Sequence, residues 1–247
     1  MEYIKLTKDN IADEHICCAF SDKKSREGYE KKKEWLKKQF DKGYRFIKGN
    51  VRGKVFIEWV PAEQAWYPLD APGFVMINCF WVSGKYKGQG YAGELLRMCL
   101  EEAKGSKGLI VLSSKKKRPY LADKKFFEHF GFQECDWAKP YFKLLFLEFD
   151  KDYLLPIFKD CAKYGTCKEN GLVAYYSHQC PFTEYYVNQE LARICRERGL
   201  ALKVHCIDSL KKAQNHCSPY TPFSLFKDGR FVTHKLLTEN SFNKVMA

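Results

Sequence analysis

The chain of 247 residues, 45% hydrophobic and 16% aromatic, is long enough for two packed domains and does not have the composition of a disordered protein. Its formal net charge of +12 suits an anionic partner such as a polyphosphorylated cofactor, or a solvated basic surface, and nucleic acid is not expected because no nucleic-acid-binding motif accompanies the charge. No apolar run approaches the ~18 residues that cross a membrane and no signal peptide is visible at Met1–Asn10, so we expect a cytoplasmic protein without membrane contact.

The first half of the chain alternates helical and strand patterns. Apolar residues at helical spacing predict helices at Ala12–Phe20, Ser25–Asp41, between Gly90 and Gly105, and at Asp123–Phe130. Aromatic and β-branched residues predict strands at Tyr44–Lys48, Lys54–Pro61, Phe74–Val82, Leu109–Ser113 and Tyr141–Phe149. Prolines indicate a long loop at Ala62–Gly73. This order predicts an α/β (α+β) fold around a mixed sheet.

A second unit follows a segment without a strong strand pattern, Asp150–Asn170, which we expect to be a helical or irregular connector. Strands are predicted at Leu172–Tyr176, Ala201–Ile207, Phe223–Phe226 and Arg230–His234. Helices are predicted at Glu184–Arg198, around Ser209–Asn215 and from near Thr238. The pair Asp228-Gly229 predicts a hairpin between the last two strands. The chain therefore divides into residues 1–149, a connector at 150–170 and a smaller βαβαββα unit at 171–247.

A glycine-rich loop, Lys87–Ala92 (KGQGYA), stands between a predicted strand and a predicted helix. Backbone N–H groups in such a loop converge on an anion, and the helix N-terminus adds its partial positive charge. The alternative is a plain tight turn, which has the same glycine pattern. The segment also resembles the pyrophosphate loop of GNAT acetyltransferases, whose pattern is Arg/Gln-x-x-Gly-x-Gly/Ala, with Lys87 in the first place. The preceding strand Ile77–Val82 and the aromatic segment Phe126–Phe132 (FFEHFGF) resemble further features of that family, over residues ~3–149.

The resemblance implies a GNAT fold that moves the acetyl group of acetyl-CoA to an amine acceptor by direct attack. It places the cofactor pyrophosphate on the backbone N–H groups of Lys87, Gly88, Gln89, Gly90, Tyr91 and Ala92. It also implies that the pantetheine arm pairs with the backbone near Trp81 and Val82. The acceptor stays open between a small amine, an antibiotic, a peptide N-terminus and a lysine.

The general acid departs from the family pattern. Many members have a tyrosine in the second position of the aromatic pair, where it protonates the departing CoA thiolate. This chain has Phe127 there, which has no proton to give. Tyr120 is a candidate for the same role, and so is water.

The general base is sought among carboxylates, because the acceptor amine must lose a proton. Glu58 is a charged residue in an otherwise apolar predicted strand, where it either reaches the cleft or faces solvent. Glu63 and Asp70 are rivals on the following loop.

Cys180 begins a turn, Cys-Pro-Phe-Thr, at the start of a predicted helix, a position that lowers the pKa of a thiol. The turn resembles that of thioredoxin and glutaredoxin, with Thr183 in place of the second cysteine, and Pro222 would be the facing cis-proline. The two-unit arrangement is similar to GNAT acetyltransferases with a YoaP-like, thioredoxin-like C-terminal domain. Cys180 is thus a catalytic candidate; the alternatives are a thiol-handling or substrate-binding protein working through Cys180, and a turn that serves as scaffold.

The eleven cysteines are interpreted as free thiols, since no secretion signal accompanies them. His178 with Cys180 and His216 with Cys217 lack two further ligands at the usual spacing of a structural zinc site. We therefore expect no metal.

Overall fold

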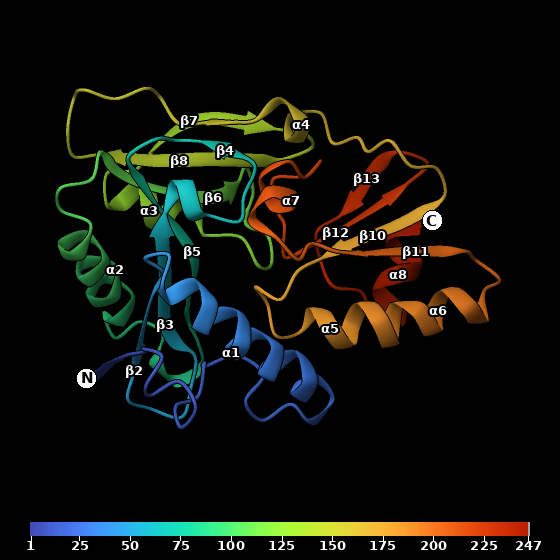
Figure 1. Ribbon diagram of the computed structural model, residues 1–247, viewed down its shortest axis with the longest axis horizontal. Helices are drawn as coiled ribbons and strands as arrows, with labels where there is room; N and C mark the ends of the chain where they lie inside the picture. Colours follow the sequence, from blue (N-terminus) through green and yellow to red (C-terminus); the bar gives the residue numbers. More distant parts are fainter. Residues whose placement is uncertain (247) are drawn as a thin grey trace.

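Two mixed β-sheets organise the computed structural model, which describes residues 1–246 (Figure 1). The first sheet has seven strands in the order β1-β2-β3-β5-β6-β8-β7. They are β1 (Tyr3–Lys5), β2 (Arg45–Gly49), β3 (Val55–Pro61), β5 (Phe74–Val82), β6 (Gly108–Ser114), β7 (Gln133–Ala138) and β8 (Phe142–Glu148). All neighbours are antiparallel except β5 and β6. This confirms the predicted mixed α/β fold.

Helices cover both faces of this sheet, because successive side chains of its strands point to opposite sides. Phe56 of β3 packs in one core cluster with Trp35 and Leu36 of α1 (Arg26–Phe40). The neighbouring Ile57 packs in the other cluster, with apolar residues of α2 (Tyr91–Glu102) and α3 (Lys124–His129).

The second sheet has four strands in the order β11-β10-β12-β13. They are β10 (Leu172–Tyr176), β11 (Leu202–Cys206), β12 (Phe223–Lys227) and β13 (Arg230–Thr233). Only β10 and β11 are parallel. The helices are α5 (Thr183–Tyr185), the π-helical η4 (Tyr186–Leu191), α6 (Ala192–Glu197), α7 (Leu210–Gln214) and α8 (Glu239–Met246). The predicted βαβαββα order is thus present, with its own apolar core.

Three local predictions were wrong or incomplete. Ala12–Phe20 is a series of turns instead of a helix, since Cys17 and Ala19 adopt left-handed backbone angles of +62° and +59°. The short edge strands β1 and β7 were not predicted. The expected connector contains the two-residue strand β9 (Ile157–Phe158), paired with β4 (Leu69–Asp70), and the short helix α4 (Asp160–Lys163).

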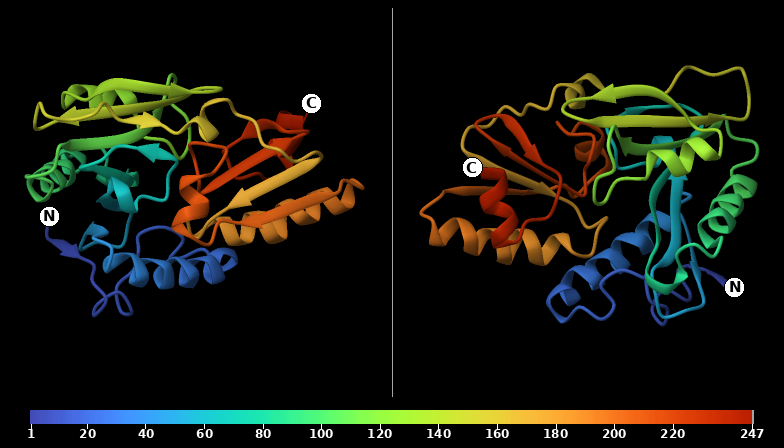
Figure 2. Two further views of the ribbon diagram at one scale, coloured as in Figure 1. Left: turned by 45° about the horizontal axis from the view of Figure 1, so that its top comes forward. Right: turned by 180° about the vertical axis from the view of Figure 1, so that it is seen from behind.

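The two units lie directly against each other, with α1 beside the helix that begins at α5 (Figures 1 and 2). Gly28 of α1 faces the carbonyl oxygen of Pro181, where a Cβ atom would lie only 2.2 Å away. Lys31 on the same helix forms an ion pair of 2.9 Å with Glu184. On the far side, His234 Nε2 donates to the carbonyl of Pro119 across 2.9 Å. Within residues 1–246, no helix combines the length and apolar character that a membrane crossing requires.

Candidate functional site

The glycine loop presents a row of free backbone N–H groups. Gly88 and Gly90 have left-handed φ angles of +74° and +83°, and a Cβ atom on either would meet nothing within 4 Å. Gly90 is the N-cap of α2. Among residues 1–246, no hydrogen-bond acceptor pairs with the backbone N–H groups from Gly88 to Gly93. Unpaired N–H groups at the start of a twelve-residue helix form an anion-binding site.

A wedge opens between β5 and β6 beside this loop. The two parallel strands pair only as far as Ile77 and Val111. Beyond that point β6 stays paired with β8 to Ser114, while β5 stays paired with β3 to Val82. The register shifts at this point, because Glu58 pairs with Cys79 but the next residue of β3 pairs with Ile77. Such a bulge bends the strand and leaves the β6-facing edge of β5 without a ladder.

An anion site at the mouth of an open strand edge suits a ligand with a pyrophosphate and an extended arm. Comparison of the sequence with family models gives two matches. The model described as Acetyltransferase (GNAT) family matches residues 9–132, and the one described as YoaP-like matches residues 201–244. The chain belongs to the GNAT acetyltransferase family. It transfers an acetyl group from acetyl-CoA, which confirms the predicted acetyl transfer and the predicted cofactor.

Three relatives match this acetyltransferase over different lengths of its chain. A protein of Bacillus subtilis (strain 168), named uncharacterized N-acetyltransferase YoaP, is 44% identical over 100% of this chain and 98% of its own length. A GNAT family acetyltransferase from Brucella melitensis, solved in complex with acetyl-CoA, is 17% identical with a TM-score of 0.39, over 62% of this chain and 91% of that chain. The structure of PH1933 from Pyrococcus horikoshii OT3 is 18% identical with a TM-score of 0.42, over 60% of this chain and 99% of that chain.

Glu58 is fully buried, so the alternative that it faces solvent is wrong. Lys32 Nζ lies 2.6 Å from its Oε1, and the hydroxyl of Tyr44 donates to its Oε2. Burial is the largest single influence on the pKa of Lys32 and acts to lower it, but the carboxylate of Glu58 and two nearby thiols together raise that pKa above its ordinary value. The result is a charged ion pair inside the acetyltransferase.

Sequence reasoning missed Lys32 and Tyr44. A signal was present for Lys32, which lies three and four residues before Trp35 and Leu36 and therefore on the buried face of α1. A lysine on an apolar helix face predicts a buried acidic partner.

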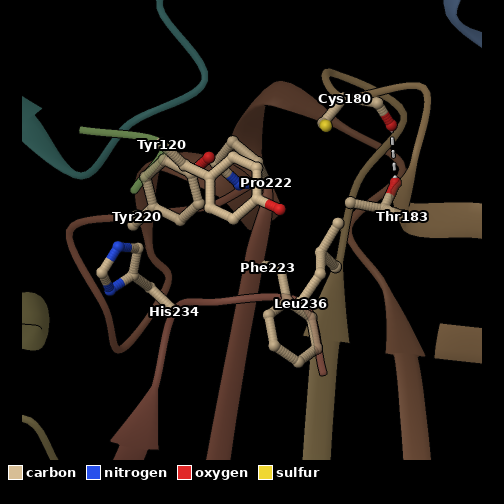
Figure 3. Close-up of a pocket in the computed structure, with 8 residues that line it drawn as sticks. All are labelled: Tyr120, Cys180, Thr183, Tyr220, Pro222, Phe223, His234 and Leu236. Atoms are coloured by element: carbon tan, nitrogen blue, oxygen red, sulfur yellow. Dashed lines mark hydrogen bonds between the residues drawn. The ribbon is translucent and has the colours of Figure 1, made fainter. Parts of the chain in front are cut away.

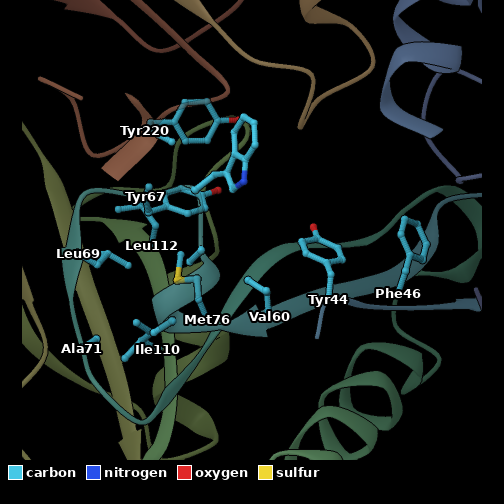
Figure 4. Packing of buried hydrophobic residues seen from close by; sticks show 14 of the residues in the cluster. Tyr44, Phe46, Val60, Tyr67, Leu69, Ala71, Met76, Ile110, Leu112 and Tyr220 are labelled. Atoms are coloured by element: carbon cyan, nitrogen blue, oxygen red, sulfur yellow. The ribbon is translucent and has the colours of Figure 1, made fainter. Parts of the chain in front are cut away.

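Buried thiols and phenols surround this ion pair. The thiols of Cys18, Cys79 and Cys180 lie close enough to Lys32 and Glu58 for their charges to interact. Burial raises the pKa of Cys79 and that of Tyr67 well above their ordinary values. Tyr67 and Tyr220 stand together near the ends of the strands, apart from Tyr44 farther along the sheet (Figure 4). We define the interdomain cluster as the packed side chains of Cys18, Lys32, Tyr44, Glu58, Tyr67, Cys79, Cys180 and Tyr220.

Tyr120 lies next to this cluster, together with Cys180 and Tyr220, where the gap between the side chains is too small for a water molecule (Figure 3). Its backbone has a φ of +67°, unusual for a tyrosine, and burial raises the pKa of its hydroxyl to about 12. Phe127 is buried among other phenylalanine rings on the opposite face of the sheet. The structure therefore places Tyr120, and not Phe127, beside the interdomain cluster.

Two expectations about the second unit's turn were wrong. The main influence on Cys180 is burial, which raises the pKa of its thiol, although a backbone hydrogen bond at Phe182 acts to lower it. Pro222 follows a trans peptide bond, since Lys139–Pro140 is the only cis bond in residues 1–246. Thr183 donates through its Oγ1 and its N–H to the carbonyl of Cys180, at 2.8 and 3.3 Å. The thioredoxin-like description of this domain stays a prediction.

The rival carboxylates lie outside the interdomain cluster. Glu63 and Asp70 are exposed, and Glu63 accepts a hydrogen bond of 2.6 Å from the N–H of Gly73. No group of three or more His, Cys, Asp or Glu side chains within the described part of the chain is arranged to hold a metal ion.

Proposed function

We propose that this protein is an N-acetyltransferase in which an amine acceptor attacks acetyl-CoA directly. The observation that supports this most is the buried carboxylate of Glu58, which lies across the strand pair from Cys79 at the point where β5 and β6 separate. The 44% identical relative is itself named an N-acetyltransferase.

The cofactor site consists of the loop and the free strand edge. The pyrophosphate binds the free N–H groups of Gly88, Gln89, Gly90, Tyr91 and Ala92, whereas the N–H of Lys87, expected to join them, already donates to the carbonyl of Gly84 at 3.2 Å. The pantetheine arm adds to β5 along Trp81 and Val82, as an extended ligand adds to an open strand. The exposed ammonium of Lys87 contributes further positive charge.

In the reaction, the acceptor nitrogen forms a bond to the thioester carbonyl carbon while the carbon–sulfur bond breaks. Glu58 takes the proton of the amine, directly or through water, and Tyr120 gives a proton to the CoA thiolate. Lys32 and Tyr44 hold the carboxylate of Glu58 in place. Cys180 lies beside the acceptor, where a neutral thiol is sufficient.

We further propose that residues 1–149 form the catalytic domain, that 150–170 connect, and that 171–247 form the second domain. All eleven cysteines are free, which supports a reducing compartment, the cytoplasm, as the place of action.

The test uses the full chain. Calorimetric titration with acetyl-CoA should give saturable binding, and a panel of amines should release CoA thiol. Glu58→Gln should lower kcat by about 10²-fold or more, the usual contribution of a positioned base, with little change in the affinity for acetyl-CoA. Equal turnover of Glu58→Gln and the parent at every pH would remove Glu58 from the mechanism.

A further inference from the structure

The loop that follows β6 carries four consecutive cations, Lys115, Lys116, Lys117 and Arg118. It leaves the sheet at the edge where β5, the parallel neighbour of β6, also ends, which is the open end of the wedge between these strands. Among the ion pairs of residues 1–246, Lys117 has Asp123 as its partner, whereas the other three cations take part in none. Three positive charges therefore stand uncompensated beside the wedge.

Arg118 differs from the lysines because its guanidinium is held in place. Its Cζ lies 3.6 Å from the centre of the Tyr141 ring, the distance of a guanidinium stacked on an aromatic face. Tyr141 is itself fixed, since its hydroxyl donates to Nδ1 of His234 at 2.7 Å. The guanidinium plane is therefore set before any ligand arrives, which reduces the entropy that binding would cost.

The guanidinium of Arg118 also lacks an acceptor. Its Nε is buried and has no hydrogen-bond partner within residues 1–246. Its surroundings are cationic: besides burial, the charges of Arg118 and Lys235 act to lower the pKa of His234, so both cations lie near that ring. Buried donors are nearly always paired, and a charge withdrawn from water normally has a counter-charge. Arg118 has the environment of an anion-binding residue.

The sheet separates Arg118 from the proposed pyrophosphate site. Gly90 begins α2, whose apolar residues pack on one face of the sheet together with Ile57. Tyr141, on which Arg118 stacks, packs on the other face in the cluster that includes Phe56. Glu58 lies on that second face too, because it is two residues along β3 from Phe56. An anion bound by Arg118 would therefore be on the side of the proposed base, away from α2.

From these observations we propose that Arg118, with Lys115 and Lys116 in the same loop, binds an anionic group of the acceptor, so that the preferred acceptor is an amine that also carries a carboxylate or a phosphate. The inference rests on the proposed N-acetyl transfer. A guanidinium of fixed plane presents paired N–H donors that match two oxygens of either group. The lysines attract the same charge without a defined geometry. Tyr120, the proposed acid, belongs to this loop as well.

The test compares acceptors that differ mainly in charge, with the full chain and with release of CoA thiol as the readout. Glutamate is measured against its dimethyl ester, and O-phosphoethanolamine against ethanolamine. We expect kcat/KM for the anionic member of at least one pair to be higher by about tenfold or more, the contribution of hydrogen bonds to a charged group. Esterification makes the amine of glutamate easier to deprotonate, so a preference for free glutamate would report binding and not intrinsic reactivity. The pair with the larger ratio distinguishes a carboxylate from a phosphate.

A variant series tests Arg118 on the better pair. Arg118→Gln should raise the KM of the anionic amine by about tenfold or more and leave that of its neutral counterpart and the Kd of acetyl-CoA unchanged. Arg118→Lys should recover part of the binding, because it restores the charge without the planar fork. Lys116→Gln removes an exposed charge without disturbing the packing on Tyr141 and should have a smaller effect in the same direction. The matched control is Arg196→Gln, on the exposed side of α6, which should change none of these constants.

The outcomes separate this inference from the proposed function. Equal or lower kcat/KM for the anionic members of both pairs, or equal KM shifts of Arg118→Gln on both members of a pair, would overturn the anion site while N-acetyl transfer stands. A raised Kd of acetyl-CoA in Arg118→Gln that is absent with acetyl-3′-dephospho-CoA would assign Arg118 to the cofactor's 3′-phosphate and overturn it as well. Absence of CoA release with every amine, despite normal acetyl-CoA binding, would remove the proposed amine acceptor and this inference with it.

Discussion

At the scale of single residues, Gly90 is the position on which the proposed cofactor binding depends most directly. Its φ of +83° and the empty space above it allow a phosphate to approach the backbone. We expect Gly90→Glu to abolish detectable acetyl-CoA binding, since its carboxylate would occupy and repel the pyrophosphate site. Calorimetry measures this.

Gly105 provides the matched control. It is exposed, has a φ of +94° and would place a Cβ atom in open space, with nothing within 4 Å, but it lies beyond the end of α2. Gly105→Glu introduces the same backbone strain and the same charge away from the loop. If both variants lose acetyl-CoA binding equally, strain and not the site explains the result.

Tyr120 is the residue that we propose as the general acid. With a pKa of about 12, its hydroxyl is protonated at neutral pH and can donate its proton in a hydrogen bond to the sulfur as negative charge develops on it. Tyr120→Phe should lower kcat by about 10²-fold with little effect on acetyl-CoA affinity. Steady-state kinetics across pH check this, and a kcat equal to the parent at all pH values would assign the proton to water.

At the scale of elements, the ion pair between Lys32 of α1 and Glu58 of β3 links a helix to the centre of the sheet. Both side chains are almost wholly buried, at 2% and 0% exposure. Removing one partner leaves an unpaired charge inside the protein, so Lys32→Met should lower the free energy of unfolding by about 3–5 kcal/mol. Urea denaturation measures the loss.

Two further variants serve as comparisons for that measurement. Lys37→Met makes the same substitution on the exposed side of α1 and should change stability by no more than about 0.5 kcal/mol. Adding Glu58→Gln to Lys32→Met removes the uncompensated charge and should recover part of the loss. A destabilisation by Lys32→Met no larger than that by Lys37→Met would contradict the structural role of the pair.

At the scale of the whole molecule, His234 connects the domains. Its Nδ1 accepts from the hydroxyl of Tyr141 at 2.7 Å, and its Nε2 donates to Pro119. Burial, with Arg118 nearby, lowers its pKa to about 4. Burial lowers the pKa of His216 to about 3. Both rings are therefore neutral in the folded protein near pH 7.

Because these two histidines stay neutral in the folded protein, its free energy of unfolding falls in mild acid. Between pH ~6.5 and 4 the unfolded chain binds protons that the folded one does not, so lowering the pH favours unfolding. His234 alone accounts for about 3 kcal/mol over that interval. Urea unfolding at several pH values should show the decline, and His234→Gln should reduce its slope. His129→Gln, on the exposed face of α3, should not; equal slopes for both variants would exclude His234 as a source.

Much of this molecule follows from local sequence. The glycines of Lys87–Ala92 specify a left-handed loop before a helix wherever the chain folds, and the pattern of Phe74–Val82 specifies a strand with the bounds that the structure shows. The element order of the second domain was likewise predicted, because each strand and helix is bounded by turn residues in the chain itself. Locally encoded backbone preferences account for these successes.

Features that depend on distant groups were decided by tertiary structure. Glu58 could face solvent or cleft until α1 placed Lys32, 26 residues away in sequence, against it. The helix start at Cys180 predicts a low pKa, but a second domain packed on the first removes water from the thiol and raises it. Ala12–Phe20 has helical spacing, yet left-handed turns at Cys17 and Ala19 bury its apolar side chains. Desolvation and ion pairing are properties of the assembled fold, so sequence alone could name these residues but not their environments.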